Sequence, residues 1–498
     1  MKGGLAVGKK RGPHEYVRPV SYLRVANVQR GFLSLDEVKT IAATEAEIKE
    51  LCLRDGDILF NEGGDRDKLG RGWVWSGELP ECIHQNHVFR ARLRTPEIVP
   101  KLVSMYANWF GQAYFLGQGK QTTNLASINL KTLSKFPFPL PPVNEQRRIV
   151  AKLEALLARS RRAKRALDAV PTLLERFRQS VLAAAFHGDL TQDWREANPN
   201  VEPASKLLER IRSERRRCWE EAELERMRAK GKVPGDDRWK ERYEAAAPVT
   251  ETTAHLPDGW AWATVDELAE ETVYGTSAKT NDNSTGVPVL RMGNLQNGKL
   301  QLADLKYLPK DHGEFPELLL KPGDMLFNRT NSPELVGKTA VYCGEPRFAS
   351  FASYLLRVRV IHHSPLLLSH FINSPAGRDW VASVVSQQVG QANVNGTKLR
   401  ALVIPVPPLD EQHAIVARID EALSRTERVM EVAREQARRL QSLEQALLSK
   451  AFRGELVPQD PSDEPASDLL MRIGAERAKP ADDEPNLRPK RRRETKVA

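Results

Sequence analysis

The chain has 498 residues, with 75 Lys or Arg against 65 Asp or Glu, so its formal net charge at pH 7 is +10. At roughly 150 residues per domain, this length suggests about three folding units, and the positive balance favours an anionic partner, nucleic acid before a membrane surface. No stretch approaches the ~20 apolar residues that span a bilayer, and the basic Lys9, Lys10 and Arg11 precede no apolar run typical of a signal peptide, so we expect a cytoplasmic protein.

The first segment, residues 1–142, alternates short apolar runs such as residues 88–93 with Gly, Asn and Pro turn signals. This pattern predicts an α+β globule with mostly antiparallel strands. Its loops carry the side chains that read DNA, since Arg binds guanine, Asn or Gln binds adenine, and Lys and hydroxyl groups hold phosphate. As a cluster they are candidates for DNA binding: Arg24, Asn27, Gln29, Asn61, Arg66, Lys68, Gln118, Lys120, Gln121, Thr122, Thr123 and Asn124.

A long helix is predicted in the next segment, residues 143–190. Apolar residues recur there in alternating steps of four and three, which is the spacing of a coiled-coil seam. Asn144 stands at the expected N-cap and Gly188 suits the helix end, whereas Pro171 should kink or interrupt the helix. The seam residues are Ile149, Leu153, Leu156, Leu167 and Leu174.

Residues 191–250 form a charged tail and linker. Many charges of both signs, including Arg215, Arg216 and Arg217, predict an exposed helix. Both a solvated face and a nucleic-acid contact are compatible with this composition.

The chain then repeats itself. Residues 141–146 (PPVNEQ) recur as residues 407–412 (PPLDEQ), an offset of 266 from Glu145 to Glu411, and residues 24–31 are matched by residues 291–298 at an offset of 267. The offset changes by only one residue over a whole domain, which indicates that the two halves share one fold. We predict the order globule, helix, tail, followed by globule, helix, tail.

The second globule is predicted in residues 251–408 and is again α+β. Its strand-like runs include residues 354–361. Its candidate DNA-binding residues are Lys279, Asn281, Asn283, Arg291, Asn294, Gln296, Lys299, Asn328, Arg329, Asn331, Gln387, Gln388, Gln391 and Asn393.

The second long helix is predicted in residues 409–456, and a partly disordered tail in residues 457–498. We expect the two long helices to pair antiparallel about a pseudo-twofold axis; the alternative is that each helix packs on its own globule. The second seam comprises Ile415, Ile419, Val429, Leu440, Leu443 and Leu447.

No catalytic constellation is found in the sequence. Residues 117–122 lack the spacing of a nucleotide-binding loop, and residues 331–334 lack the aromatic ring with which an amino-methyltransferase stacks a flipped base. The pair His362 and His363 lacks metal-ligand spacing, and the four cysteines form no C-x-x-C pair. We therefore expect a binding protein with no catalytic residue, metal or cofactor of its own.

The duplicated Pro-Pro-x-x-Glu-Gln motif opens a long helix twice, each time behind a globule that ends in a Pro-rich strand such as residues 136–139. This resembles the specificity subunit of type I restriction-modification systems, over nearly the whole chain. The resemblance implies that residues 1–142 and 251–408 are target recognition domains, each reading one half of a split site in double-stranded DNA, with the helices as spacer. It also implies two methylation subunits and restriction subunits as partners, which methylate adenine and restrict DNA with S-adenosylmethionine, ATP and Mg²⁺.

The two halves differ at their starts. The second globule opens with residues 256–262 (LPDGWAW), the usual start in the family, whereas the first half has no counterpart. We expect either that the first recognition domain is truncated at its start or that its start lies upstream.

The length of the helices suggests that they act as a ruler, that is, that they set the distance between the two DNA half-sites. A seam of roughly 36 residues at ~1.5 Å per residue spans about 54 Å, or about 16 base pairs at ~3.4 Å each, so we expect half-sites separated by several unread base pairs. The alternative function is a coiled-coil assembly scaffold whose globules bind proteins rather than DNA. A self-sufficient methyltransferase would have to transfer methyl groups alone, and we expect that it does not.

Overall fold

The computed structural model describes every residue except 10–11, 13–14, 65–67, 119, 122–125, 233, 250–254, 333–334, 389–390 and 479–498. The chain forms two compact units, one from Met1–Asp168 and Arg434–Ala498, the other from Ala169–Ala433. Of the predicted tail, residues 479–498 lie outside the described residues.

Unit 1 is an α+β globule of short strands joined to parts of two long helices. Its sheets have the orders β4-β1-β8, β7-β5-β9 and β10-β11-β6, and β2 and β3 form a hairpin. Its elements are β1 Arg18–Leu23, β2 Val28–Gln29, β3 Phe32–Leu33, β4 Lys39–Ala43, α1 Glu45–Leu51, β5 Ile58–Asn61, β6 Gly63–Gly64, β7 Gly72–Val74, β8 Cys82–His84, β9 Val88–Ala91, α2 Pro100–Gln118, β10 Lys120–Gln121, β11 Ala126–Ser127, α3 Leu130–Ser134, the first part of α4 Val143–His187, the last part of α11 Leu409–Phe452, and α12 Ala466–Ala478.

Unit 2 is built in the same way. Its sheets have the orders β12-β25, β13-β22-β18-β20, β17-β14-β21 and β19-β24-β23, with the hairpin β15-β16. Besides the rest of α4 and α11 it contains α5 Gln192–Ala197, α6 Ala204–Ala229, β12 Ala261–Thr264, α7 Val265–Leu268, β13 Ala269–Tyr274, β14 Val287–Leu290, β15 Leu295–Gln296, β16 Lys299–Leu300, β17 Lys306–Leu308, β18 Met325–Asn328, β19 Thr330–Asn331, β20 Thr339–Val341, β21 Ser350–Phe351, β22 Leu355–Val360, α8 Pro365–Asn373, α9 Pro375–Val384, β23 Ser386–Gln388, β24 Gln391–Asn393, α10 Gly396–Arg400 and β25 Val403–Val406.

The repeated sequence is a repeated fold, because strand register repeats with it. Ile58 of β5 faces Ala91 of β9, and Met325 of β18 faces Val358 of β22, so both members of the pair are displaced by the same 267 residues. Helix caps repeat as well: the side chain of Asn129 accepts a hydrogen bond at the start of α3, and Asn395 does so at the start of α10. The predicted α+β class and internal duplication are confirmed.

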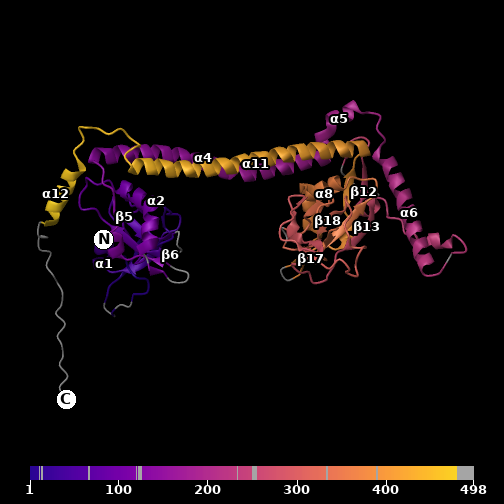
Figure 1. Ribbon diagram of the computed structural model, residues 1–498, viewed down its shortest axis with the longest axis horizontal. Helices are drawn as coiled ribbons and strands as arrows, with labels where there is room; N and C mark the ends of the chain where they lie inside the picture. The colour runs from indigo at the N-terminus through magenta and orange to yellow at the C-terminus, as the bar shows by residue number, and fades with distance from the viewer. Residues whose placement is uncertain are drawn as a thin grey trace, which may run out of the picture. The chain divides into compact units, whose positions relative to one another are not determined.

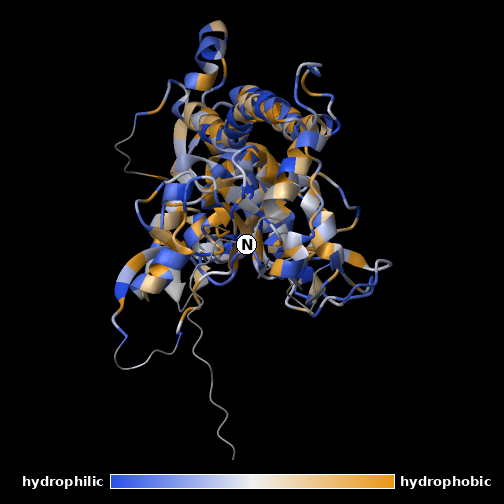
Figure 2. Ribbon diagram, turned by 90° about the vertical axis from the view of Figure 1, so that its left-hand side faces the viewer, coloured by the Kyte–Doolittle hydropathy of each residue, from blue (hydrophilic) through white to orange (hydrophobic). Residues whose placement is uncertain are grey.

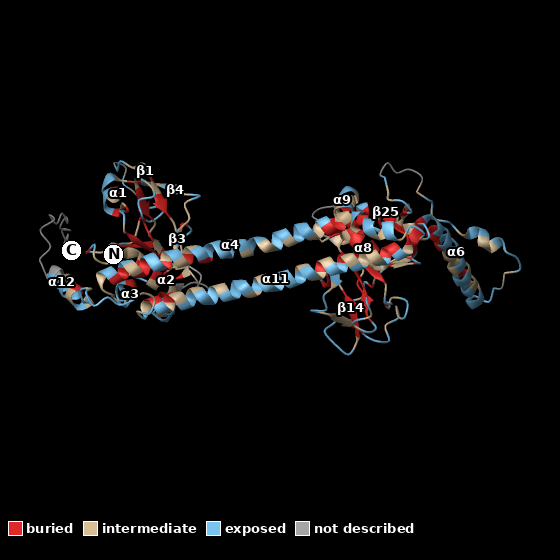
Figure 3. Cartoon of the chain, turned by 90° about the horizontal axis from the view of Figure 1, so that it is seen from above, coloured by how far each residue is buried: buried red, intermediate tan, exposed pale blue. Residues whose placement is uncertain are grey.

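The central strands are buried and mostly apolar, with one polar or charged residue in each. All four residues of β5, of β9 and of β18 are buried, and Phe60 and Phe89 contribute to the core of unit 1 together with Phe115 of α2. Figure 3 shows buried residues, coloured red, gathered inside each globule.

The long helices α4 and α11 lie side by side (Figures 1 and 3). In unit 1 the first part of α4, with Leu153, shares a core with Leu448 near the end of α11. In unit 2 the last part of α4, with Leu182, shares a core with Ile415 and Ile419 near the start of α11. The pair is therefore antiparallel, as expected.

Two details of the long helices differ from expectation, one at their starts and one inside α4. The helices begin at Val143 and Leu409, one residue before the predicted caps, because the carbonyl groups of Pro142 and Pro408 accept the first helical hydrogen bonds from Gln146 and Gln412, each at 2.9 Å. Helix α4 also continues through Pro171 without interruption. Pro171 is exposed, so water can bond the carbonyl group that lost its amide partner.

The helices are amphipathic rather than apolar all round. Hydrophilic and hydrophobic residues alternate along the helical ribbons of Figure 2. Among the described residues, no helix is long and apolar enough to cross a bilayer.

Candidate nucleic-acid interface

Two recurring asparagines that we predicted to contact DNA are instead buried loop anchors. Asn27 and Asn294 are each 3% exposed. The Asn294 side chain accepts from the amide of Arg291 at 2.8 Å and donates to the carbonyl groups of Gln301 and Ala303 at 2.7 and 3.0 Å. Asn27 makes the equivalent three bonds in unit 1, so the prediction that these amides bind DNA is corrected.

The second recurring pair, Asn61 and Asn328, is also corrected. Both side chains are fully buried at the end of a core strand. Asn61 donates to the carbonyl group of Val28 at 2.9 Å, and Asn328 donates to that of Leu335 at 2.8 Å. Their amide groups donate to the adjoining loops, while each Oδ1 is buried without a hydrogen-bond partner. Because both side chains are fully buried, neither is placed to contact a base.

The arginines that precede the asparagine anchors also turn inward. Arg24 is half-buried and pairs with Glu37 at 3.4 Å, and the Arg291 guanidinium donates to the carbonyl group of Asp304. Gln29 and Gln296 donate to the backbone of their own turns. These four side chains stabilise the loops in which they lie.

A small three-stranded sheet in each unit collects the other predicted polar residues. In unit 1, β10 pairs with β11 and β11 with β6, with Lys120 facing Ser127. In unit 2, β23 pairs with β24 and β24 with β19, with Ser386 facing Asn393. The structure describes only the backbone of Lys120, Gln121, Asn331, Gln387, Gln388 and Gln391, and it describes neither Arg66 nor Thr122, Thr123 and Asn124.

Arg329 lies at the start of the sheet in unit 2, which we call the β19–β24–β23 sheet. Its guanidinium lies 5.2 Å from the centre of the Tyr274 ring and donates to Ser353 O at 2.9 Å and Asn393 Oδ1 at 3.3 Å. The Tyr274 hydroxyl accepts from the amide of Gly396 at 2.9 Å. These contacts fix the sheet on the globule.

Exposed polar residues also gather on a loop of unit 2. Lys279, Asn281 and Asn283 are exposed. Asn281 and Asn283 line a cavity of about 340 Å³ together with Lys310. This loop can meet a phosphate or a base edge without rearranging the core.

The other predicted residues of the described chain differ in how available they are for a DNA contact. Lys299 is paired with Glu427 of α11 at 2.6 Å, and Lys68 is half-buried. Gln118, the last residue of α2, is exposed.

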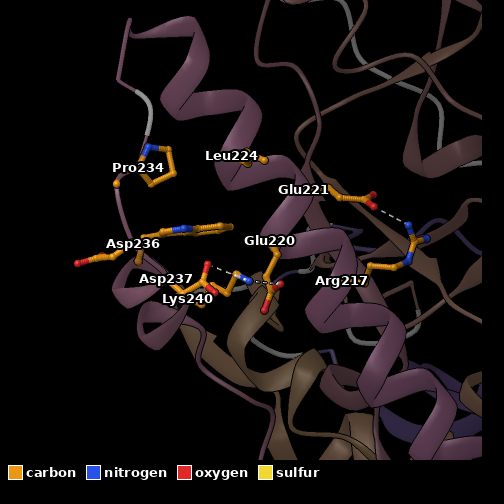
Figure 4. A pocket seen from close by; sticks show the side chains of 10 residues that line it. Arg217, Glu220, Glu221, Leu224, Pro234, Asp236, Asp237 and Lys240 are labelled. Atoms are coloured by element: carbon orange, nitrogen blue, oxygen red, sulfur yellow. Dashed lines mark hydrogen bonds and ion pairs between the residues drawn. The ribbon is translucent and has the colours of Figure 1, made fainter.

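The charged side chains of helix α6 form ion pairs with one another and with the segment that follows the helix. Arg217 pairs with Glu221 at 2.6 Å, and Lys240 lies 3.1 Å from Asp237 and 3.9 Å from Glu220 (Figure 4). These residues surround a cavity of about 630 Å³. Because acidic and basic groups alternate around it, the cavity offers no uniformly positive surface to nucleic acid.

The predicted helix seam is buried at the start of each long helix and is exposed at two positions of α11. Ile149, Leu153, Ile415 and Ile419 are buried. Half-buried seam residues are Leu156, Leu167, Leu174, Leu440 and Leu447. Val429 is 49% exposed and Leu443 53% exposed, so both are corrected. Steps of four and three assume 3.5 residues per turn, and a helix with 3.6 drifts about 20° per heptad away from that stripe.

Sequence reasoning missed the contacts that the Pro-Pro-x-x-Glu-Gln motif makes. Gln146 Oε1 accepts from the amide of Val99, and Gln412 Oε1 from that of Ser364, each at 2.9 Å, so each glutamine ties a long helix to the globule. Glu411 is fully buried. Its carboxylate accepts from Trp260 Nε1 at 2.8 Å, Thr191 Oγ1 at 2.7 Å and Arg195 Nη1 at 2.6 Å. The exact repetition of the motif was the signal that could have revealed this role.

Unit 1 repeats this junction with different partners. Glu145 is 3% exposed and accepts from Gln459 Nε2 at 2.7 Å. Arg148 pairs with Asp463 at 2.5 Å, and the Arg148 guanidinium lowers the pKa of the Asp463 carboxyl. In each unit the tail that follows one long helix thus covers the start of the other.

Two histidines lie buried where the globule of unit 2 meets the helices. Burial lowers the pKa of His363 to about 4. The pKa of His370 is also lowered to about 4, chiefly by burial and to a lesser extent by the charge of Arg178. Neither belongs to a cluster of three potential metal ligands among the described residues.

The chain resembles known proteins along most of its length. Residues 105–169 and 257–436 match the family model of the type I restriction modification DNA specificity domain. The specificity subunit of the type I restriction enzyme EcoKI from Escherichia coli strain K12 is 27% identical over 370 residues, which cover 71% of this chain and 67% of that protein. The EcoDI specificity subunit of Escherichia coli is 25% identical over 404 residues, covering 78% and 80%.

A solved structure shares the fold. A chain from a study of complex assembly and conformational transition of the type I R-M system superposes with a TM-score of 0.61 at 20% identity, covering 88% of this chain and 92% of that one.

Proposed function

Since the chain belongs to the specificity subunits of type I restriction-modification systems, we propose that residues 1–142 and 251–408 are its two target recognition domains. Each domain reads one half of a split site in double-stranded DNA. The observation that carries this proposal is the repetition of one fold, with the same small polar sheet in both copies. The family makes the chain the DNA specificity subunit and not a catalytic one.

We assign base reading to the two small sheets and to the exposed loop of unit 2. Gln121 facing Ala126 corresponds to Gln387 facing Ala392, so equivalent positions can be compared. Lys120 corresponds to Ser386, and Thr122 to Gln388. Residues that differ in this way suit two half-sites of different sequence, whereas identical buried pairs such as Asn61 and Asn328 suit a shared scaffold.

The long helices with their junctions, residues 143–190 and 409–456, are proposed as the spacer between the domains. Residues 191–250 serve as a charged linker and residues 457–498 as a tail. The proposed partners are two methylation subunits and the restriction subunits, which supply S-adenosylmethionine, ATP and Mg²⁺ chemistry. The chain and its complex are proposed to act in the cytoplasm.

A DNA-binding test uses the chain assembled with its methylation subunits. Host methylome sequencing, with and without this gene, identifies the methylated site. Affinity for a duplex carrying that site is then measured from 50 to 200 mM salt, and phosphate contacts predict a steep fall in affinity with salt. An affinity that ignores both salt and DNA sequence would instead support a scaffold whose globules bind proteins.

Base reading by the sheets is tested with paired substitutions. Gln387→Ala should relax one half-site, by about 1–3 kcal/mol of discrimination, and the equivalent Gln121→Ala should affect only the other half-site. If both variants kept full specificity at both half-sites, the sheets would not be the readers.

A further inference from the structure

In unit 2, residues 256–274 close the globule. Strand β12 pairs antiparallel with β25, and β13 pairs with the outer edge of β22. Helix α6 packs on β12 and α7, and the amide of Ala204 at its start donates to the carbonyl group of Gly259 at 2.8 Å. This segment therefore covers two strand edges and one helix face.

Unit 1 has the same surfaces without this cover. Lys2 faces Arg90 of β9 as Val273 faces Arg357 of β22. Thus Lys2 takes the place of Val273, and none of the described residues takes the place of residues 256–271.

The first uncovered surface is the segment 137–140, which corresponds to β25. Ile404, Pro405 and Val406 are buried against β12, whereas Phe138 and Leu140 are half-buried and Pro137 and Pro139 are exposed. Within the described part of the chain, this segment pairs with no strand.

The second uncovered surface is the edge of β9, which carries a buried positive charge. In unit 2, Glu271 of β13 accepts from Arg357 at 2.7 Å and pairs with Arg359 at 2.6 Å. In unit 1 the corresponding Arg90 is 6% exposed and donates to the carbonyl groups of Glu50 and Cys52. No carboxylate among the described residues pairs with it, although an unpaired buried charge is costly.

The third uncovered surface is the apolar face of α12. Leu207 and Leu208 of α6 correspond to Leu469 and Leu470 of α12 by the repeated Glu-Pro-Ala-Ser sequence that precedes them. Leu208 is 3% exposed, but Leu470 is 56% exposed and its neighbour Met471 is 66% exposed. Leu469 remains buried, so α12 is seated on unit 1 with one side of its apolar face open.

We propose that these three surfaces form one docking face for an added polypeptide segment with the chemistry of residues 256–271. The occupant adds a strand beside 137–140, rests a short apolar helix on α12, and places a carboxylate beside Arg90. Three independent features of the face, an open strand edge, an open apolar helix and an unpaired arginine, match the three parts of the segment that covers unit 2. This inference concerns protein–protein contact alone and stands whether or not the globule reads DNA.

A fusion of residues 256–271 directly before Met1 of the full chain tests the proposal. The register at Lys2 requires no linker. Because prolines carry no amide proton, only Phe138 and Leu140 of residues 137–140 can donate to an added strand. Hydrogen exchange at these two amides should slow at least tenfold, with slower exchange along β9 as well. Unchanged exchange in the fusion protein would overturn the proposal.

The contact chemistry is tested in trans with a labelled peptide of residues 256–271 and the unmodified chain. Anisotropy should show one peptide bound per chain, and Leu470→Asp should weaken binding at least tenfold. Phe32→Asp is the matched control, since Phe32 is also 56% exposed in unit 1 but lies on β3; this variant should bind normally.

Charge recognition has its own readout. A peptide carrying Glu271→Gln should bind at least tenfold more weakly, because it offers no carboxylate to Arg90. No saturable binding, or binding that Leu470→Asp leaves unchanged, would contradict the proposed face; the latter result would mean that the peptide displaces its own copy in unit 2.

Discussion

The junction at Glu411 gives the sharpest test of how the repeated motif holds the protein together. Glu411→Ala removes a fully buried carboxylate that accepts from Trp260, Thr191 and Arg195. Breaking a buried ion pair costs about 3–5 kcal/mol. Arg195 is 20% exposed and regains some water, so we expect a loss of about 4 kcal/mol.

The matched variant is Glu145→Ala in unit 1. Glu145 has the same place in the motif but accepts from the Gln459 amide, which is uncharged. One bond between a charged and a neutral group contributes about 1.5–3 kcal/mol, so this variant should lose about 2 kcal/mol.

Hydrogen exchange is the suitable assay, because a chain with two units has no single free energy of unfolding. Slow amides of unit 2 should exchange about 1000-fold faster in Glu411→Ala, which is the ~4 kcal/mol above expressed as a rate ratio. Those of unit 1 should not change. Equal effects of Glu411→Ala and Glu145→Ala on their own units would refute the reasoning from the contacts.

Three further predictions follow from the geometry. Asn294→Ala should destabilise unit 2 by about 2–3 kcal/mol, because two buried carbonyl groups lose their donor, whereas Asn283→Ala on the exposed loop should leave hydrogen exchange in unit 2 unchanged; equal exchange rates in the two variants would contradict the anchor role. The pKa of His370 is about 4 in the folded chain, against 6.5 for an unperturbed histidine. The stability that the neutral His370 contributes is therefore fully present above pH 6.5 and is lost as pH falls towards 4. His370→Gln should make the stability–pH curve shallower in this range, and an unchanged slope would be evidence against this role of His370. Deleting one heptad from both α4 and α11 removes about 10 Å of helix, or about 3 base pairs, and should shorten the preferred DNA spacer without changing the half-sites; an unaltered spacer would rule out the ruler.

Much of the fold could be predicted because duplication makes each half a control for the other. The offset of the Pro-Pro-x-x-Glu-Gln motif predicted two globules, two long helices and their antiparallel pairing, all of which the structure contains. Strand-by-strand topology was beyond the sequence, because strands of two to six residues leave too short a pattern for pairing to be inferred.

The site was less predictable, and the errors have two causes. Asn27 and Asn61 have the residue type that reads adenine, but residue type does not reveal burial. Their recurrence as Asn294 and Asn328 was the available warning, since positions that read different bases should differ between the halves. Leu443 failed for a geometric reason: a strict heptad pattern drifts off one face of a straight helix.

The central claim is that each globule reads its own half of the DNA site. It is tested most directly by replacing residues 256–408 with the matching segment of a relative that has a different target, in the assembled methylation complex, and sequencing methylated adenines in the host. The account predicts that one half-site changes to that of the relative while the other half-site persists. A change in both half-sites, or in neither, would contradict it.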